Sequence, residues 1–232
     1  MILTSRNHPK LHGRQAGFTI VELMIATLVF STVLLVITFG IIQFSRSYYR
    51  GTTTTTLQNT TRSVIDSVSQ AIQFSGTDMT SWVSGNSGTY CIGGTQFDYV
   101  LHSQRAGDSL KAGQSWHVLY SSPAAAGNCS QKGFNTSNGV FADSNSRDIV
   151  DPNIRIVKFS VAALNGNPNV YTVDVRLAYG DDDLLCSPSA NDCSSKATST
   201  HLNNTDLVCK IANGSQFCAV SELSTIVQKR VQ

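Results

Sequence analysis

The sequence predicts an α+β protein in which one long N-terminal helix packs on an antiparallel sheet. An apolar run covers residues 18–45, helical apolar spacing follows over residues 46–75, and residues 76–232 alternate short apolar runs with Ser, Thr, Asn and Gly. An amphipathic helix and a one-faced sheet can each bury the surface that the other would otherwise leave in water. The 232 residues, 41% of them apolar, suit one domain of moderate size rather than a multidomain assembly.

Residues 18–45 predict a membrane-spanning helix. Their only charged side chain is Glu22, and the run exceeds the ~20 residues that cross a bilayer as a helix. A secretory signal peptide would instead have an apolar core of about 7–15 residues followed by a small-residue cleavage site. Because a carboxylate in hydrocarbon is costly, Glu22 is a candidate functional residue.

Residues 46–75 predict an amphipathic continuation of the same helix. Five apolar residues recur at helical spacing with polar residues between them: Leu57, Val64, Ile65, Val68 and Ile72. The five threonines at 52–56 follow Gly51 and predict a bend or a loosened turn, because β-branched residues disfavour helix. A plain polar junction, where the helix leaves the membrane, is the alternative.

Residues 76–232 predict strands joined by polar loops. Apolar and polar residues alternate over 170–179, which indicates a strand with one buried face. Its expected partner is 154–161, joined to it through the turn at 165–168. The other expected strands are 97–101, 116–120, 206–211 and 216–231, and the expected variable loops are 76–96, 121–153 and 181–205.

The cysteines predict disulfides and an oxidising compartment, because all six follow the apolar run. They are Cys91, Cys129, Cys186, Cys193, Cys209 and Cys218. Zinc is the alternative, but it favours close pairs at C-x₂₋₄-C spacing and no gap here is that short. Proximity suggests Cys209 with Cys218 around a turn at 213–214, and Cys186 with Cys193. That leaves Cys91 for Cys129, although six cysteines allow 15 pairings.

Charge and motif content argue against several function classes. The net charge is +2, and three basic residues in the first 17 (Arg6, Lys10 and Arg14) leave −1 for the remainder. That balance gives no electrostatic footprint for nucleic acid. No nucleophile stands beside a base, and no phosphate-binding loop occurs, so we expect neither an enzyme nor a cofactor.

An acidic run is a second candidate metal site, besides the cysteines. Asp181, Asp182 and Asp183, with Asp192 nearby, are weak calcium candidates. Their spacing is not that of an EF-hand, which needs acids at alternating positions and a glycine at the sixth. A solvated acidic turn is the alternative.

The segment "GFTIVEL", residues 17–23, follows a short basic leader and opens the long apolar helix. It resembles the prepilin signature of type IV pilins and type II secretion pseudopilins. The resemblance implies that a prepilin peptidase removes residues 1–17 by cutting between Gly17 and Phe18. It also implies that Phe18 is then N-methylated and that subunits pack through their helices into a filament.

Glu22 is the acid of that signature. A neighbouring subunit's Phe18 ammonium can pair with the Glu22 carboxylate, which offsets the desolvation of both charges and fixes axial register. The alternative is a plain single-span anchor in which Glu22 reaches the interface or lies near the positive end of the helix dipole.

The resemblance most favours a minor pilin. Removing residues 1–17 leaves 215 of 232 residues, long for a major subunit, and residues 18–72 lack the kinking proline common in major subunits. The implied partners are other pilins, the peptidase and an inner-membrane assembly platform. The implied location is the cytoplasmic membrane, crossed once with the C-terminal domain outside, and then an extracellular pilus that serves adhesion or motility. The alternatives are a type II secretion pseudopilin and an adhesin or DNA-uptake pilin.

Overall fold

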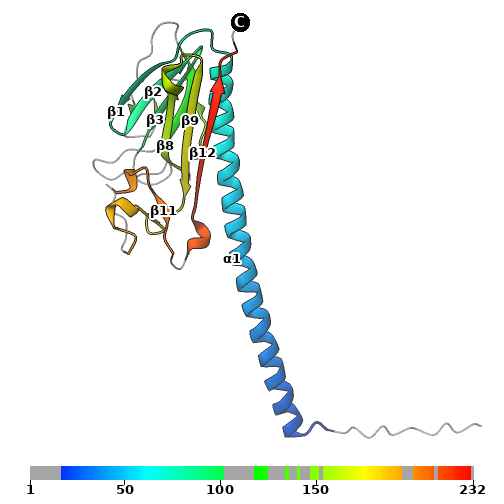
Figure 1. Ribbon diagram of the computed structural model, residues 1–232. Helices are drawn as coiled ribbons and strands as arrows, with labels where there is room; N and C mark the ends of the chain where they lie inside the picture. Colours follow the sequence, from blue (N-terminus) through cyan, green and yellow to red (C-terminus); the bar gives the residue numbers. More distant parts are fainter. Residues whose placement is uncertain are drawn as a thin grey trace, which may run out of the picture. The chain divides into compact units, whose positions relative to one another are not determined.

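The computed structural model describes residues 17–101, 118–124, 134–135, 140–141, 147–151, 154–194, 201–211 and 214–230. The chain divides into two compact units, the first ending at Ser45 and the second beginning at Arg46. Helix α1 (Ile20–Gln73) contributes its first half to one unit and its second half to the other. The second unit also contains antiparallel sheets (Figure 1), so the predicted fold class is confirmed.

Helix α1 continues without interruption through the threonines at 52–56, so the predicted loosened turn is wrong. The hydroxyls of Thr52, Thr53, Thr54 and Thr55 each donate to the backbone carbonyl four residues earlier, at 2.7–2.9 Å. This pattern satisfies the hydroxyls within the helix itself. The helix therefore does not have to open to solvate them.

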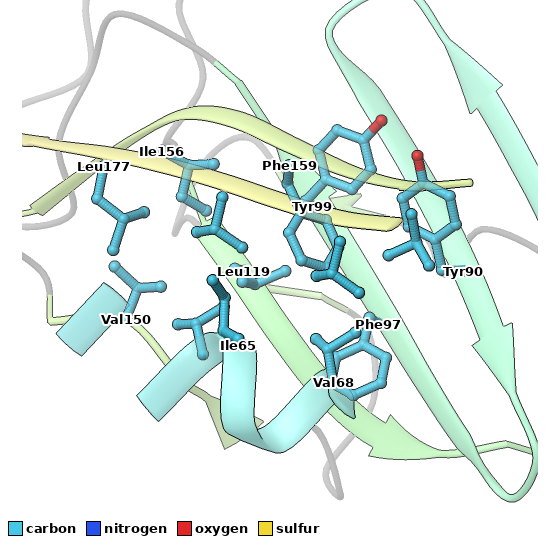
Figure 2. Close-up of a cluster of buried hydrophobic side chains, with 14 of the residues drawn as sticks. Ile65, Val68, Tyr90, Phe97, Tyr99, Leu119, Val150, Ile156, Phe159 and Leu177 are labelled. Carbon is cyan, nitrogen blue, oxygen red and sulfur yellow. The ribbon is translucent and has the colours of Figure 1, made fainter. Parts of the chain in front are cut away.

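The second half of α1 buries the face that the sequence predicts. Leu57, Val64, Ile65, Val68 and Ile72 are all buried, as is Thr61 between them. Figure 2 shows Ile65 and Val68 against aromatic and aliphatic side chains of the sheets, including Phe97, Leu119 and Phe159. The helix and the sheets thus share one apolar core.

Two sheets surround this core. One has the order β1-β2-β3-β4-β7 and the other the order β12-β9-β8, and all pairings are antiparallel. The strands of the first are β1 (Thr80–Ser84), β2 (Ser87–Ile92), β3 (Thr95–Val100), β4 (Val118–Pro123) and β7 (Arg147–Asp148). Those of the second are β8 (Ile154–Ala163), β9 (Val170–Tyr179) and β12 (Ala219–Gln228). Two short pairs complete the set, β5 (Phe134–Asn135) with β6 (Val140–Phe141) and β10 (Leu185–Cys186) with β11 (Val208–Cys209).

The predicted hairpin of residues 154–161 and 170–179 is confirmed as β8 and β9, which pair from Ile154↔Tyr179 to Ala163↔Tyr171. Its turn places Asn165 at φ 52° and Gly166 at φ 74°, the left-handed region that these two residue types tolerate best. The turn residues therefore favour the register next to the turn, and an irregularity between Ile156 and Lys158 shifts the pairing by one residue beyond it.

Residues 76–96 are not a loop, because β1 and β2 form a hairpin there. Every residue of β1 is exposed, so the strand has no buried face to produce an alternating pattern. The predicted strands at 206–211 and 216–231 are also shorter, as β11 and β12.

The far face of the five-stranded sheet carries buried polar groups. Thr89 donates to Asp98 at 2.6 Å, and the Gln96 amide donates to both Asp98 oxygens at 2.9 Å. Successive residues of β3 point to opposite faces, so Phe97 and Tyr99 enter the core while Gln96 and Asp98 face away from it.

Residues 180–218 form an insertion between β9 and β12, which we call the β9–β12 insertion. Leu185, Leu202 and Leu207 from this insertion pack with Val157 of β8 and Ala178 of β9 as a second, smaller core. The insertion is therefore a packed element on the three-stranded sheet.

The end of β12 meets the end of α1. The Arg230 backbone N–H donates to the Gln73 carbonyl at 3.1 Å, and the Arg230 guanidinium lies 5.2 Å from the Phe74 ring. Lys229 pairs with Asp78 at 2.9 Å. Cations at a helix C-terminus complement the helix dipole, so the last described residues stabilise this end of the helix.

Candidate processing and assembly site

Thr19 and Glu22 cap the N-terminus of α1 through reciprocal hydrogen bonds. The Thr19 backbone N–H and hydroxyl both donate to Glu22 Oε2 at 2.9 Å, and the Glu22 N–H donates to the Thr19 hydroxyl at 3.2 Å. Leu23 then makes the first regular helical bond, to the Thr19 carbonyl. This is a capping box, in which an N-cap Thr and a Glu three residues later satisfy each other's backbone donors.

Sequence reasoning missed Thr19 as a partner of Glu22. The signal was present, because Thr-x-x-Glu directly before an apolar run is the sequence pattern of a capping box. Glu22 thus has a local role within its own chain, in addition to any role between chains.

Residues Ile20 to Phe44 of α1 are exposed along their whole length. The helix is long and apolar enough to cross a membrane near the N-terminus of the chain. Its hydroxyl groups do not contradict this, because Thr27, Ser31, Thr32 and Thr38 each donate to a carbonyl of the preceding turn. The apolar helix fits the membrane anchor of a prepilin.

The predicted cleavage junction lies just before this helix. Gly17 and Phe18 are both exposed and precede the first helical residue, Ile20. An added Cβ at Gly17 would meet no atom within 4 Å, so this fold does not itself require glycine there. The leader residues 1–16 lie outside the described part of the chain.

Comparison with known proteins identifies one feature of the chain. The family model of the prokaryotic N-terminal methylation motif matches residues 12–38. This chain carries a prepilin methylation signal. No curated protein and no solved structure matches the chain.

The matched motif is the signal of type IV pilin and pseudopilin precursors, which are structural subunits rather than enzymes. It implies processing by a prepilin peptidase and assembly with other pilins. The expected resemblance to the prepilin family is thereby confirmed at residues 12–38, which hold Gly17, Phe18 and Glu22.

The structure pairs Cys186 with Cys193 and Cys209 with Cys218 as disulfides, the two pairings that sequence proximity suggested. Cys91 lies on β2, and the Cys129 expected as its partner is outside the described residues. Both observed bridges lie in the β9–β12 insertion, where short segments and a small core leave few other constraints on the backbone.

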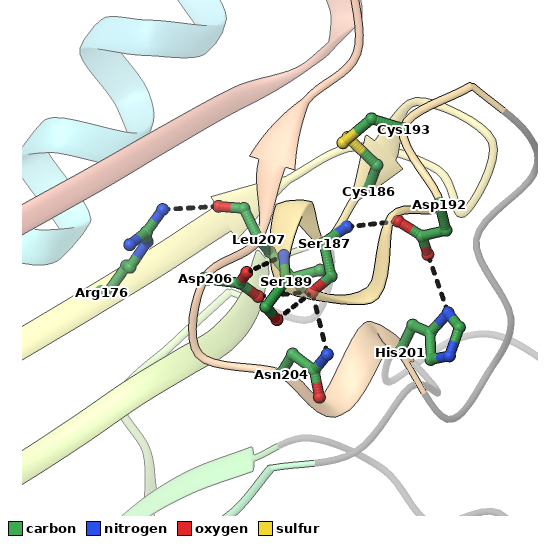
Figure 3. The surroundings of a disulfide bond; sticks show 10 residues. All are labelled: Arg176, Cys186, Ser187, Ser189, Asp192, Cys193, His201, Asn204, Asp206 and Leu207. Atoms are coloured by element: carbon green, nitrogen blue, oxygen red, sulfur yellow. Dashed lines mark hydrogen bonds and ion pairs between the residues drawn. A yellow bond between two sulfur atoms is a disulfide. The ribbon is translucent and has the colours of Figure 1, made fainter.

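Polar side chains beside the first disulfide form a connected network (Figure 3). The Ser187 hydroxyl donates to Asp206 at 2.5 Å, and the Ser189 N–H donates to the same carboxylate at 2.7 Å. Burial acts to raise the pKa of Asp206, but the bonds from Ser187 and Ser189 outweigh it and lower that pKa. Arg176 of β9 donates to the Leu207 carbonyl at 2.7 Å, which ties the network to the sheet.

Among the described residues, the aspartates expected to bind calcium do not form a group close enough to share one ion. Asp182 forms an ion pair with Arg155 of β8, whose side chain is fully buried. Asp192 instead accepts from the Ser187 N–H at 2.6 Å and pairs with His201. Sequence reasoning did not find Arg155 as the partner of Asp182, because the two are brought together only by the packing of the insertion on β8.

Within the described residues, one set of His, Cys, Asp and Glu donors is close enough to share a metal ion. It consists of Asp192 with Cys186 and Cys193. Those two sulfurs are bonded to each other, so neither is a thiolate that could bind a metal. The set is therefore the neighbourhood of a disulfide.

Proposed function

We propose that this chain is a structural subunit of an extracellular filament, a minor pilin of a type IV pilus. The observation that carries the proposal is the methylation motif over residues 12–38, continuous with an apolar helix whose only charge up to Ser45 is Glu22. In this proposal residues 1–17 are the cleaved leader, residues 18–45 cross the membrane and later line the filament core, and residues 46–75 join them to the globular domain of residues 76–232.

In the assembled filament, Glu22 pairs with the Phe18 ammonium of a neighbouring subunit. The capping box is compatible with this pairing, because both Thr19 bonds go to Oε2 and a carboxylate offers about four acceptor sites on its two oxygens. An acid held in one orientation by its own helix start is also preorganised to receive a second partner.

Mass spectrometry of the mature N-terminus tests the processing step. We expect a chain that begins with N-methylated Phe18 in membranes and filaments. Gly17→Leu should leave the full-length precursor, because the peptidase must approach the backbone closely at the cut. Gly40→Leu is the matched control, since Gly40 lies in the apolar helix with open space around it and should not affect cleavage. A normally shortened Gly17→Leu product would refute the assigned junction.

Three variants separate the role of Glu22 within its chain from its role between chains. Glu22→Ala removes the charge and the acceptor of both bonds from Thr19, but it keeps the bond from the residue-22 N–H to the Thr19 hydroxyl. Glu22→Gln removes the charge and keeps an acceptor for Thr19. Thr19→Ala keeps the charge and the backbone bond to Glu22 but removes the hydroxyl cap, which costs about 0.5–2 kcal/mol of helix stability. Breaking a buried ion pair costs about 3–5 kcal/mol, so the charge should dominate assembly.

The measurement is the ratio of each subunit in sheared filaments to that in membranes, with cleavage scored in the same samples. We expect all three variants to be cleaved. Incorporation should fall most for Glu22→Ala, less for Glu22→Gln, which still accepts a hydrogen bond, and least for Thr19→Ala. A Glu22→Ala subunit incorporated at the wild-type level would exclude the pairing and favour the plain membrane anchor.

The proposed partners are sister pilins, the prepilin peptidase and an inner-membrane assembly platform. Pseudopilins of type II secretion systems share the methylation motif. The amount of subunit in the sheared filament fraction also distinguishes a type IV pilin from such a pseudopilin. Recovery of the subunit in filaments sheared from the cell surface supports a pilus, whereas its retention in the envelope of an enzyme-secreting cell supports a pseudopilin.

A further inference from the structure

Exposed aromatic and apolar side chains occur at the start of the second unit. They come from the first turns of α1 in this unit and from the β9–β12 insertion. Their exposed fractions are 62% for Tyr48, 51% for Tyr49, 106% for Ile211 and 44% for Phe217. We call these four residues the junction patch.

Within the junction patch, Phe217 of the insertion contacts Tyr49 of α1. The ring centroids of Tyr49 and Phe217 lie 5.4 Å apart, and those of Tyr48 and Tyr49 lie 6.1 Å apart. The aromatic pairs thus bring the insertion to this position on α1. In Figure 1 the short orange-red 3-10 helix that precedes β12 lies beside α1.

A disulfide closes the loop that carries the apolar residues of the insertion. Ile211 follows Cys209 by two residues, and Phe217 directly precedes Cys218, to which Cys209 is bonded. The fold therefore keeps a fully exposed isoleucine on a cross-linked segment. Ile211 and Phe217 thus both lie within the short loop that this disulfide closes.

The position of the patch along the chain indicates what covers it. Tyr49 follows Ser45, the last residue of the apolar run, by four residues, or about 6 Å along a helix. Tyrosines are enriched at the water interface of a bilayer, where one side of the ring is apolar and the other wet. Arg46 and Arg50 flank the two tyrosines, and basic side chains attract anionic headgroups.

We propose that the junction patch rests on the lipid headgroup layer while the subunit is anchored in the membrane. Ile211 and Phe217 enter the interface beside Tyr48 and Tyr49, so the insertion gives the globular domain a second, peripheral contact with the bilayer. This proposal rests on the proposed membrane span of residues 18–45. The contact limits rotation of the domain about the helix and is released when the subunit leaves the membrane.

Site-specific photo-crosslinking of the full chain tests this proposal. A benzophenone amino acid replaces Ile211 in the chain, which is inserted into nanodiscs of phosphatidylethanolamine and phosphatidylglycerol. Because Ile211 is fully exposed, the replacement removes no packing. After illumination, mass spectrometry identifies what is attached at position 211, and we expect a phospholipid adduct.

Two further positions make the outcome decisive. Ile226 is a matched control, because its side chain is also exposed (63%) but lies near the end of β12 that is farther from Phe217. A benzophenone at position 226 should give no lipid adduct. Val36, exposed within the apolar run, reports on the membrane span itself. Lipid at positions 36 and 211 but not at 226 supports the proposal.

A lipid adduct at position 36 without one at position 211 would refute the contact between the junction patch and lipid, and would still support the membrane span. Attachment of position 211 to a second copy of the chain also overturns it, in favour of a contact between subunits. Absence of lipid at both 36 and 211 would instead refute the membrane span on which the proposal rests.

Discussion

The two halves of α1 have the same backbone structure and opposite surroundings. From Ile20 to Phe44 every residue is exposed, whereas the second half buries Leu57, Val68 and Ile72 among the sheets. Within the described residues, no part of the chain covers the apolar surface of this first half. The hydrophobic effect favours covering that surface with lipid or with neighbouring helices, whereas the sheets cover the second half.

Substituting one leucine in each half of α1 tests this difference most directly. Leu57→Ala should destabilise the globular domain by about 2–5 kcal/mol, because it leaves a cavity in a core that is closed around it. Leu35→Ala removes the same atoms from an exposed position and should leave the stability of that domain unchanged. Denaturant unfolding of the full chain in detergent, followed by near-UV circular dichroism, measures both.

Equal losses in the two leucine variants would contradict this division of the helix. Such a result would mean that the first half of α1 also stabilises the domain of its own chain.

In the five-stranded sheet, which covers the second half of α1, Gly88 lies very close to the side chain of Tyr99. A Cβ at Gly88 would lie 2.7 Å from the Tyr99 hydroxyl and 2.8 Å from its ring, next to the core in Figure 2. Gly88→Ala should therefore cost about 1–3 kcal/mol through overpacking. Gly94→Ala is the control, because an added Cβ there meets no atom within 4 Å. A Gly88→Ala protein as stable as the Gly94→Ala protein would show that Tyr99 can move aside.

The polar side of the second half of α1 faces an open groove of about 690 Å³, and Asp148 is one of the residues that line this groove. Burial raises the pKa of Asp148 to about 6 from its ordinary 3.8, against the opposing hydrogen bond from the Val150 N–H. The folded chain therefore binds this proton more tightly than the unfolded chain does. Between about pH 6 and pH 4, acidification should stabilise the fold through this group by at most about 1.4 kcal/mol per pH unit.

Asp148→Asn isolates that contribution, because its amide oxygen still accepts from Val150. The variant should be more stable than wild type at pH 7, and the difference should vanish as the pH falls toward 4. Urea unfolding of both proteins across this range measures it. A difference that does not change with pH would show that Asp148 titrates normally.

The smallest expected effect is at the junction of the two halves. Thr55→Ala should raise helix stability by up to about 0.5 kcal/mol, because alanine has the higher helix propensity and Thr55 is exposed. The Gly51 carbonyl loses the hydroxyl donor but keeps its backbone partner. Far-UV circular dichroism during thermal unfolding measures the change, and a clear loss of stability would show that the hydroxyl bonds hold the helix together here.

The helix and the β8–β9 hairpin were predictable because their signals are local. Periodicity alone marks the buried residues of α1, and the turn at Asn165 and Gly166 sets the pairing of two long strands. The β1–β2 hairpin also had a local signal, the Gly85-Asn86 pair between its strands, with Gly85 at φ 56°. Sequence reasoning gave more weight to alternation, which an exposed edge strand does not show.

The remaining features depend on contacts between distant segments. The burial of Arg155 follows from the position of Asp182, and the polar groups around Asp98 follow from the pairing of β2 with β3. At the candidate site, residues Gly17, Phe18 and Glu22 were predictable because their signature is a continuous segment that the methylation motif also covers. The hydrogen bonds of Thr19 are equally local, because both partners of the capping box lie within that segment.

The two ends of the β9–β12 insertion adjoin one residue pair of the sheet, because Tyr179 of β9 and Ala219 of β12 are direct partners. Its length can therefore change without shifting any residue of β9 relative to β12. Lengthening a loop between fixed ends is entropically inexpensive, at about 0.6 kcal/mol for each doubling. The surface that this segment presents can thus change between related chains, while the pairing of β9 with β12 and helix α1 stay the same.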